Sequence, residues 1–162
     1  MGPMELTASH VFAATPEAVH AMMTDVAFLR HAAAAAGAQS RGLHATPSRT
    51  ETTLLVSAPP EVRVFVGALL TLRQTMEWGP AGDDGSRRGT LTIDVADTPV
   101  TVRATTRLQP TASGSRLDYA GHLNVDVPVL GRVIERQASS QILAALDAQQ
   151  RIGAEWLTRG EG

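Results

Sequence analysis

The chain opens with alternating apolar and polar residues, and this period of two predicts a β-strand over about residues 4–13. One face of such a strand meets a core and the other meets solvent. The face expected to turn inward carries Leu6, Ala8, His10 and Phe12. Among the five histidines, His10 is therefore the one to check for a place in a buried site.

Two short helices are predicted after this strand. Thr15-Pro16-Glu17 is typical of a helix start, because threonine caps the first turn, proline suits it and an acid complements the positive helix end. The second helix is expected over about residues 26–36. It contains the run from Ala32 to Ala36, which has high helix propensity, and Gly37 makes a natural stop.

From residue 38 to residue 127 the pattern changes to that of strands. Turn signals at 79–85, 97–99 and 111–114 separate segments that alternate or are rich in β-branched residues. The predicted strands cover about 39–46, 50–57, 70–78, 88–95, 99–109 and 115–127. Such short connections favour an antiparallel meander. For residues 59–67 the pattern leaves two predictions, either a strand or a helical turn that lies over the mouth of the sheet.

A long amphipathic helix is predicted from about residue 129 to residue 157, where proline is absent and apolar residues recur at helical spacing. It would be roughly 40 Å long. Its apolar stripe consists of Leu130, Ile134, Ala138, Ile142, Ala145, Ile152 and Trp156. Gln141 and Gln149 lie within that stripe, whereas Ser139 and Leu143 fall outside it and are expected at solvent or an interface.

Strand alternation also predicts which side chains of the sheet face inward. The inward set is Leu70, Leu72, Gln74, Met76, Trp78, Leu91, Ile93, Val95, Val100, Val102, Ala104, Leu108, Leu117, Tyr119, Leu123 and Val125. The outward set includes Arg103, Arg107, Arg116 and Asp118, which suits solvent and charge pairing. A mainly apolar interior with few polar groups fits either a filled core or a small-molecule site.

Composition narrows the function classes. A hydrophobic fraction of 43% and a charged fraction of 19% are globular values, and 162 residues fit one domain, which we expect over 4–158 with tails at 1–3 and 159–162. The net charge of −2 gives no electrostatic reason to expect nucleic acid. Cysteine is absent, no signal peptide is evident at the start, and no apolar run is long enough to span a membrane. We therefore expect a cytoplasmic protein, monomeric or homodimeric.

A family resemblance rests on the order of elements and on two segments. Residues 11–19 contain the A-x-P-x-x-V step Ala14-Thr15-Pro16-Glu17-Ala18-Val19, and residues 125–131 lead into the last helix. Both resemble the START and birch-pollen-allergen-like superfamily, also called SRPBCC or polyketide-cyclase-like, and more narrowly an actinobacterial family of unknown function. The resemblance implies an α+β helix-grip fold, in which a curved antiparallel sheet wraps around the C-terminal helix.

The resemblance also implies an internal cavity for lipids, polyketides, sterols or similar molecules, without implying a reaction. The residues expected to line such a site are Gln74, Met76, Trp78, Tyr119, Ile134, Gln141, Ile142, Ala145 and Gln149. The glutamines are the most informative, because a buried amide without partners costs about 1–3 kcal/mol. They either contact a ligand or water in the cavity, or bond to nearby backbone at an exposed margin.

Three functions remain open from the sequence. The first is binding or transport of a small hydrophobic molecule, and the second is an enzyme of the cyclase or aromatase type. For the enzyme, the catalytic candidate is His10, with Tyr119 and Gln74 as further polar groups. The third is a protein-interaction module with a filled core and no ligand. The histidines lack metal-ligand spacing, and we expect neither a metal nor a cofactor.

Overall fold

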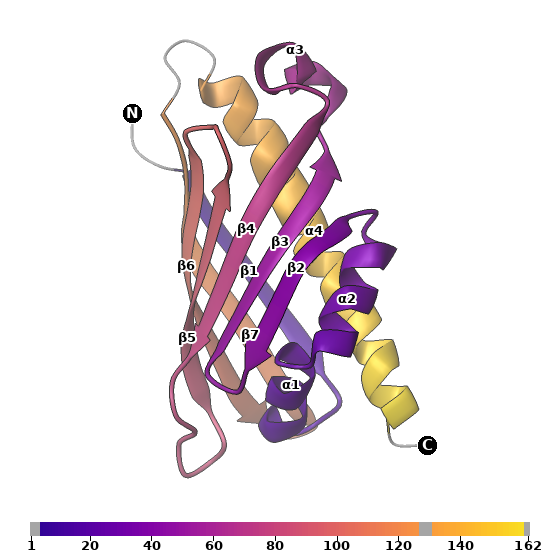
Figure 1. Cartoon of the computed structure of the whole chain (residues 1–162). Coiled ribbons are helices and arrows are strands. Elements are labelled where there is room, and N and C mark those ends of the chain that lie inside the picture. Colours follow the sequence, from indigo (N-terminus) through magenta and orange to yellow (C-terminus); the bar gives the residue numbers. More distant parts are fainter. Residues whose placement is uncertain (1–3, 127–130, 161–162) are drawn as a thin grey trace.

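The computed structural model describes residues 4–126 and 131–160. In this part of the chain, seven strands form one antiparallel sheet in the order β1-β7-β6-β5-β4-β3-β2 (Figure 1). The strands are β1 (Met4–Phe12), β2 (Gln39–Thr46), β3 (Arg49–Ser57), β4 (Leu69–Trp78), β5 (Arg87–Val95), β6 (Val100–Thr111) and β7 (Gly114–Val125). The predicted strands are confirmed with small shifts at their ends. The sheet curves around one long helix, which is the helix-grip arrangement.

The two short helices are α1 (Pro16–Met23) and α2 (Val26–Ala35), and their ends follow the predicted signals. The Thr15 hydroxyl accepts a hydrogen bond from the backbone N–H of Ala18 at 3.2 Å. Asp25 caps α2 in the same way, since its carboxylate accepts from the N–H of Ala27 at 2.8 Å. After α2 the chain turns at Gly37, whose φ of +80° favours glycine.

Residues 59–67 form helical turns and not a strand. The short 3₁₀ helix η1 (Pro60–Val62) continues into α3 (Arg63–Val66), which lies at the upper end of the sheet in Figure 1. The Arg63 Nε donates to the carbonyl of Ala58 at 2.9 Å and ties these turns to the end of β3. Gly67, with φ of +88°, redirects the chain into β4. Val62, Val64 and Val66 alternate in the sequence as residues of a strand would, but they lie in these helical turns.

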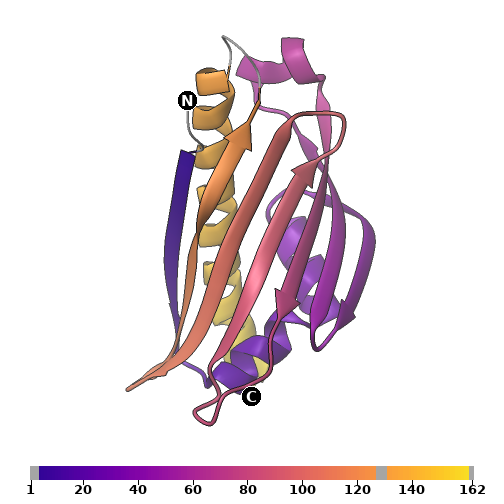
Figure 2. The same cartoon turned by 90° about the vertical axis from the view of Figure 1, so that its left-hand side faces the viewer.

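The last helix, α4 (Gly131–Gly160), crosses the whole sheet and packs mainly on β1 and β7, with α1 and α2 against its other side (Figure 2). Leu130 and the rest of 127–130 lie outside the described residues. The expectation for Ser139 and Leu143 is wrong: Ser139 is buried and Leu143 is half-buried against the core. Because α4 packs toward the edge strand β1, side chains beyond the apolar stripe are covered too.

The lower half of the molecule in Figure 1 is filled by large side chains. Val19, Met22 and Met23 of α1 and Phe28 of α2 are buried. On the sheet, the inward residues of these lower segments are Met76, Trp78, Leu91, Ala104, Leu108, Leu117 and Tyr119, all buried. Gly153 of α4 lets the helix approach this region, because a Cβ there would lie 3.0 Å from Met22 Cε and 3.1 Å from Phe12 Cε1. The core is therefore closed at the α1 end.

A candidate ligand-binding cavity

A cavity of about 380 Å³ lies in the other half of the molecule, between α4, α2 and the inward face of β3–β6, and reaches η1 and α3. This volume falls within the range of small-molecule sites. Its sheet wall consists of Thr52, Leu54, Val56, Ser57, Leu70, Leu72, Gln74, Ile93, Val95, Val100 and Val102. Pro59, Val62 and Val66 line it at the α3 end. The cavity is thus an apolar chamber beneath the helical turns of 60–66.

The space exists for two structural reasons. First, α4 rests mainly on β1 and β7 and does not pack closely on β3–β6. Second, the helix walls that face this space include several small side chains, since α2 contributes Ala32 and Ala33 and α4 contributes Ala138 and Ala145. Alanine fills little volume, so the opposing walls do not meet. The alanine run predicted a helix from its propensity, and the structure shows that it also forms a cavity wall.

The helix α4 presents two parallel rows of side chains to the cavity. Residues four positions apart lie close together on one side of a helix. The apolar row consists of Ile134, Ala138, Ile142 and Leu146, and the second row consists of Gln137, Gln141, Ala145 and Gln149. Gln141 and Ala145 are exposed, whereas Gln137 and Gln149 are half-buried, so the glutamine row lies toward the opening of the cavity.

The sheet wall carries a further polar pair. Gln74 of β4 is directly opposite Thr52 of β3 in the strand register, and both line the cavity. Among the residues the structure describes, the side chains of Gln74, Gln137, Gln141 and Gln149 make no hydrogen bond to protein. These four amides therefore have their full hydrogen-bonding capacity available to the cavity contents.

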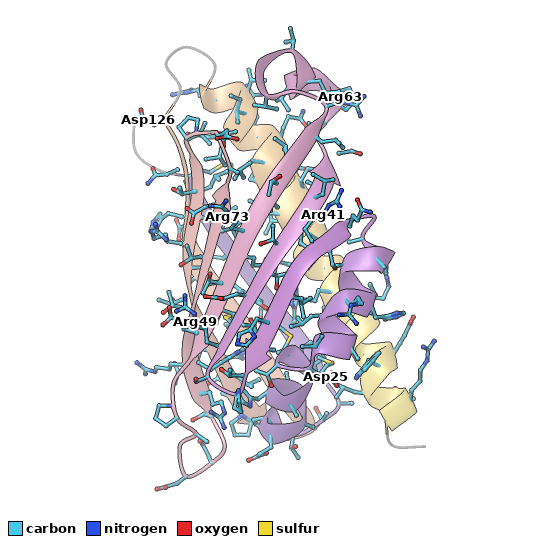
Figure 3. The ribbon with its side chains drawn as sticks, in the orientation of Figure 1. Asp25, Arg41, Arg49, Arg63, Arg73 and Asp126 are labelled. Carbon is cyan, nitrogen blue, oxygen red and sulfur yellow. The ribbon has the colours of Figure 1, made fainter. Side chains whose placement is uncertain are left out.

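None of the lining residues is ionisable. Charged side chains are carried by the same elements but stay outside the cavity wall. Arg41 of β2, Arg63 of α3 and Arg73 of β4 are exposed, and Figure 3 shows them spread over the elements that surround the cavity. Arg49 instead pairs with Glu77 across β3 and β4 on the outer face, at 2.8 Å. The cavity wall is therefore mainly apolar, and its few polar groups are uncharged.

The predicted ligand-binding residues separate into two groups. Six of them line the cavity together, namely Gln74, Ile134, Gln141, Ile142, Ala145 and Gln149. Met76, Trp78 and Tyr119 face inward as predicted but belong to the filled half near α1 and do not line the cavity. Strand alternation predicts which face of the sheet a side chain is on. It does not predict where along the strand the helices pack, and this position decides whether an inward side chain meets the cavity or the packed core.

His10 is buried, with 6% of its side chain exposed, and lies beside Tyr119 with ring centroids 5.8 Å apart in an edge-to-face arrangement. Its Nε2 is 3.4 Å from Oδ1 of Asp147 on α4. Burial raises the pKa of the Tyr119 hydroxyl, so this group stays protonated at neutral pH. Neither ring lines the cavity. The geometry places His10 in the contact between β1 and α4, with Tyr119 of β7 packed beside it.

A second buried histidine belongs to the filled end. The His20 Nε2 donates to the carbonyl of Pro47 at 2.8 Å, and its ring packs edge-to-face on Trp78 with centroids 5.5 Å apart. Desolvation by burial lowers the pKa of His20, a bond to the Pro47 carbonyl opposes this, and Arg87 lowers the pKa further. The neutral ring with its proton on Nε2 therefore fits this site.

Gln137 is the lining glutamine that sequence reasoning missed, and Thr52, Ser57 and Thr98 are further polar lining residues outside the predicted set. Gln137 lies one i, i+4 step before Gln141, so extending the glutamine spacing backwards would have found it. The inward residues of β3 and the alanines of α2 were missed for another reason. Nothing in their pattern shows that α2 lies across from β3 and α4, because this is decided by tertiary packing.

Comparison with known proteins identifies the family. The DUF2505 family, described as proteins of unknown function, matches residues 7–157. The chain belongs to this family. Curated relatives include the uncharacterized proteins Mb0491c of Mycobacterium bovis and Rv0481c of Mycobacterium tuberculosis, each 28% identical over 91 residues. The matched region is 55% of this chain and 52% of each relative, so the chain spans about half the length of the curated relatives it matches.

Solved structures show the same fold. TTHA0849 from Thermus thermophilus superimposes with a TM-score of 0.65 at 14% identity, over 98% of this DUF2505 chain and 99% of that chain. A STAR-related lipid transfer protein from Xanthomonas axonopodis gives a TM-score of 0.65 at 17% identity, over 92% of this chain and 85% of that one. These likenesses establish the START-like helix-grip fold that the sequence resemblance implied.

No helix between residues 4–126 or 131–160 is long and apolar enough to cross a membrane. In the same residues, no three histidine, aspartate or glutamate side chains are grouped as a metal site would require.

Proposed function

We propose that this DUF2505 protein binds a small hydrophobic molecule in the cavity between α4, α2 and β3–β6. The observation that carries the proposal is the cavity itself, about 380 Å³ in volume with mainly apolar walls. A protein interior is normally packed without such spaces, so a chamber of this size between helices and sheet needs an explanation. A bound apolar molecule supplies one, and the lipid-transfer protein of the same fold supports it by analogy.

Binding is better supported than catalysis by the same geometry. General acid–base catalysis needs a group that titrates near neutral pH within reach of the substrate. No lining residue of the cavity is ionisable, and neither His10 nor its neighbour Tyr119 lines the cavity. A carrier or sensor needs only shape, apolar surface and a few polar groups. We therefore propose a binding protein and not an enzyme. We also propose that it acts in the cytoplasm.

The direct experiment is native mass spectrometry of the protein purified from its natural host, with a fluorescence titration of the purified protein as the second arm. N-phenyl-1-naphthylamine is a suitable probe because it is uncharged, apolar and fluorescent in apolar sites. We expect a retained small molecule and a saturable fluorescence increase. A protein that carries no molecule and leaves the probe fluorescence unchanged contradicts the proposal.

A matched pair of variants assigns the binding to the cavity. Ala33 lines it, whereas its neighbour Ala34 is exposed on the other side of α2. Ala33→Phe should fill the chamber and abolish probe binding, and Ala34→Phe should leave the titration unchanged. Thermal unfolding of both variants checks that they fold. Equal binding by wild type and Ala33→Phe would place the probe elsewhere and count against the cavity.

A further inference from the structure

The cavity wall carries its polar groups in a pattern that restricts the ligand. Gln137, Gln141 and Gln149 follow one side of α4, and Gln74 faces the cavity from β4. Consecutive members of a helix row are about 6 Å apart along the axis, and Gln137 to Gln149 spans roughly 18 Å. The row is long enough to run beside an extended molecule, next to the apolar row of Ile134, Ala138, Ile142 and Leu146.

An apolar ligand that fills the chamber displaces water from the half-buried amides of Gln74, Gln137 and Gln149, whereas Gln141 is exposed at the opening and keeps contact with solvent. Each half-buried amide then needs a partner from the ligand, since the described protein atoms supply none to it. Carbonyl oxygens and hydroxyl groups are suitable partners, because an amide both donates and accepts. A pure hydrocarbon leaves the amides unpaired and is disfavoured.

Charge on the ligand is disfavoured for a separate reason. A carboxylate, phosphate or ammonium group that enters the chamber loses its hydration. It meets no opposite charge there, because none of the lining residues is ionisable. Arg41, Arg63 and Arg73 are exposed and lie outside the wall.

We propose that the cavity selects an elongated, uncharged, largely hydrocarbon molecule that carries hydroxyl or carbonyl oxygens along one edge. That edge lies against the row Gln137–Gln141–Gln149, and its hydrocarbon body lies against the apolar row and β3–β6. Gln74 binds a polar group from the opposite wall. This inference rests on the proposed binding function and adds the chemical class of the ligand.

The first test compares two probes that differ in charge. N-phenyl-1-naphthylamine is neutral, and 1-anilinonaphthalene-8-sulfonate is nearly the same molecule with a sulfonate. For each probe, the fluorescence that is present in wild type and lost in Ala33→Phe is the part that arises from the cavity. We expect the cavity to bind the neutral probe at least about tenfold more tightly. Equal cavity affinities would overturn the inference about charge while leaving the binding function intact, whereas failure of both probes contradicts the binding function itself.

The second test concerns the amide row. Monolaurin is uncharged and carries ester and hydroxyl oxygens, and its affinity is measured by displacement of the neutral probe. Replacing both Gln137 and Gln141 by leucine keeps the side-chain size and removes the hydrogen bonds. We expect the double variant to bind monolaurin roughly tenfold more weakly and the neutral probe at least as tightly as wild type.

The control variant is Gln150→Leu on the same helix. Gln150 does not line the cavity and its amide bonds to the backbone of β1. This variant should retain the monolaurin affinity of wild type. If the double variant also retains it, the amides do not contact the ligand and the proposed role of the row is wrong. Side-chain NH₂ signals of the glutamines in NMR spectra provide a direct readout, because those of Gln74, Gln137 and Gln141 should shift with monolaurin.

Discussion

The side-chain amide of Gln150 donates a hydrogen bond from Nε2 to the backbone carbonyl of Val11, at 3.0 Å. This bond joins the C-terminal half of α4 to the edge strand β1, next to the contact between His10 and Asp147. Because β1 is an edge strand, it has a neighbouring strand, β7, on one side only. The bond therefore helps to hold α4 on β1, and neither Gln150 nor Val11 lines the cavity.

Gln150→Leu should lower the free energy of unfolding by about 0.5–1.5 kcal/mol, the usual net value of one hydrogen bond. The neighbouring Gln149→Leu should change it by less than about 0.5 kcal/mol, because Gln149 bonds to no described protein atom. Urea denaturation of both variants measures the difference. Equal destabilisation would show that the Gln150 bond does not help to hold α4 on β1.

His10 is expected to act in packing. His10→Ala removes a ring buried between β1 and α4 and should cost about 1–3 kcal/mol of stability. The Asp147 side chain is 74% exposed, so Asp147→Ala should cost less than about 1 kcal/mol.

The same His10 variant also tests the enzymatic alternative. Its affinity for N-phenyl-1-naphthylamine should equal that of wild type, because His10 does not line the cavity. Turnover of a trial polyketide by wild type that disappears in a folded His10→Ala protein would instead support a catalytic histidine. Asp147→Ala is the control, since it removes the partner of His10 and keeps the ring.

The sequence contained enough information for the fold because each element has a strong local signal. The period-two alternation of β1 placed His10 inward, and Thr15 and Gly37 marked helix ends that the structure shows. These signals depend on neighbouring residues alone. They do not depend on how distant elements pack.

The site was less predictable because it depends on packing between elements. Met76 and Gln74 are inward on the same strand, yet only Gln74 reaches the cavity. The difference arises because α1 fills the end of the sheet near Met76, and no local pattern encodes this. Ser139 was placed outside the stripe for the same reason, since a helix wheel cannot show that β1 covers a second side of α4.

The stability of the protein should depend on the titration of His20. Burial lowers the pKa of this histidine in the folded state, whereas the unfolded chain has the ordinary value of about 6.5. The unfolded state therefore binds the proton more readily, and the resulting stability is present above pH 6.5 and declines as the pH falls below it. His20→Gln should weaken this decline. Urea denaturation across the acid range measures it, and parallel curves for the two proteins would contradict the assignment.

Gly67 offers a test of the helical turns that cover the cavity. Its φ of +88° and ψ of 177° lie in a region that is essentially restricted to glycine, and a Cβ there would meet nothing within 4 Å. Gly67→Ala should therefore cost about 1–3 kcal/mol through backbone conformation alone. Because the strain falls at the junction of α3 and β4, amide hydrogen exchange should speed up most over residues 60–68, and the neutral probe should dissociate faster.

Gly42→Ala on β2 is the control, since its added Cβ makes only ordinary contacts with Thr53 at 3.9 Å. If Gly67→Ala exchanges and releases the probe as wild type does, the turns of 60–66 do not control access to the cavity.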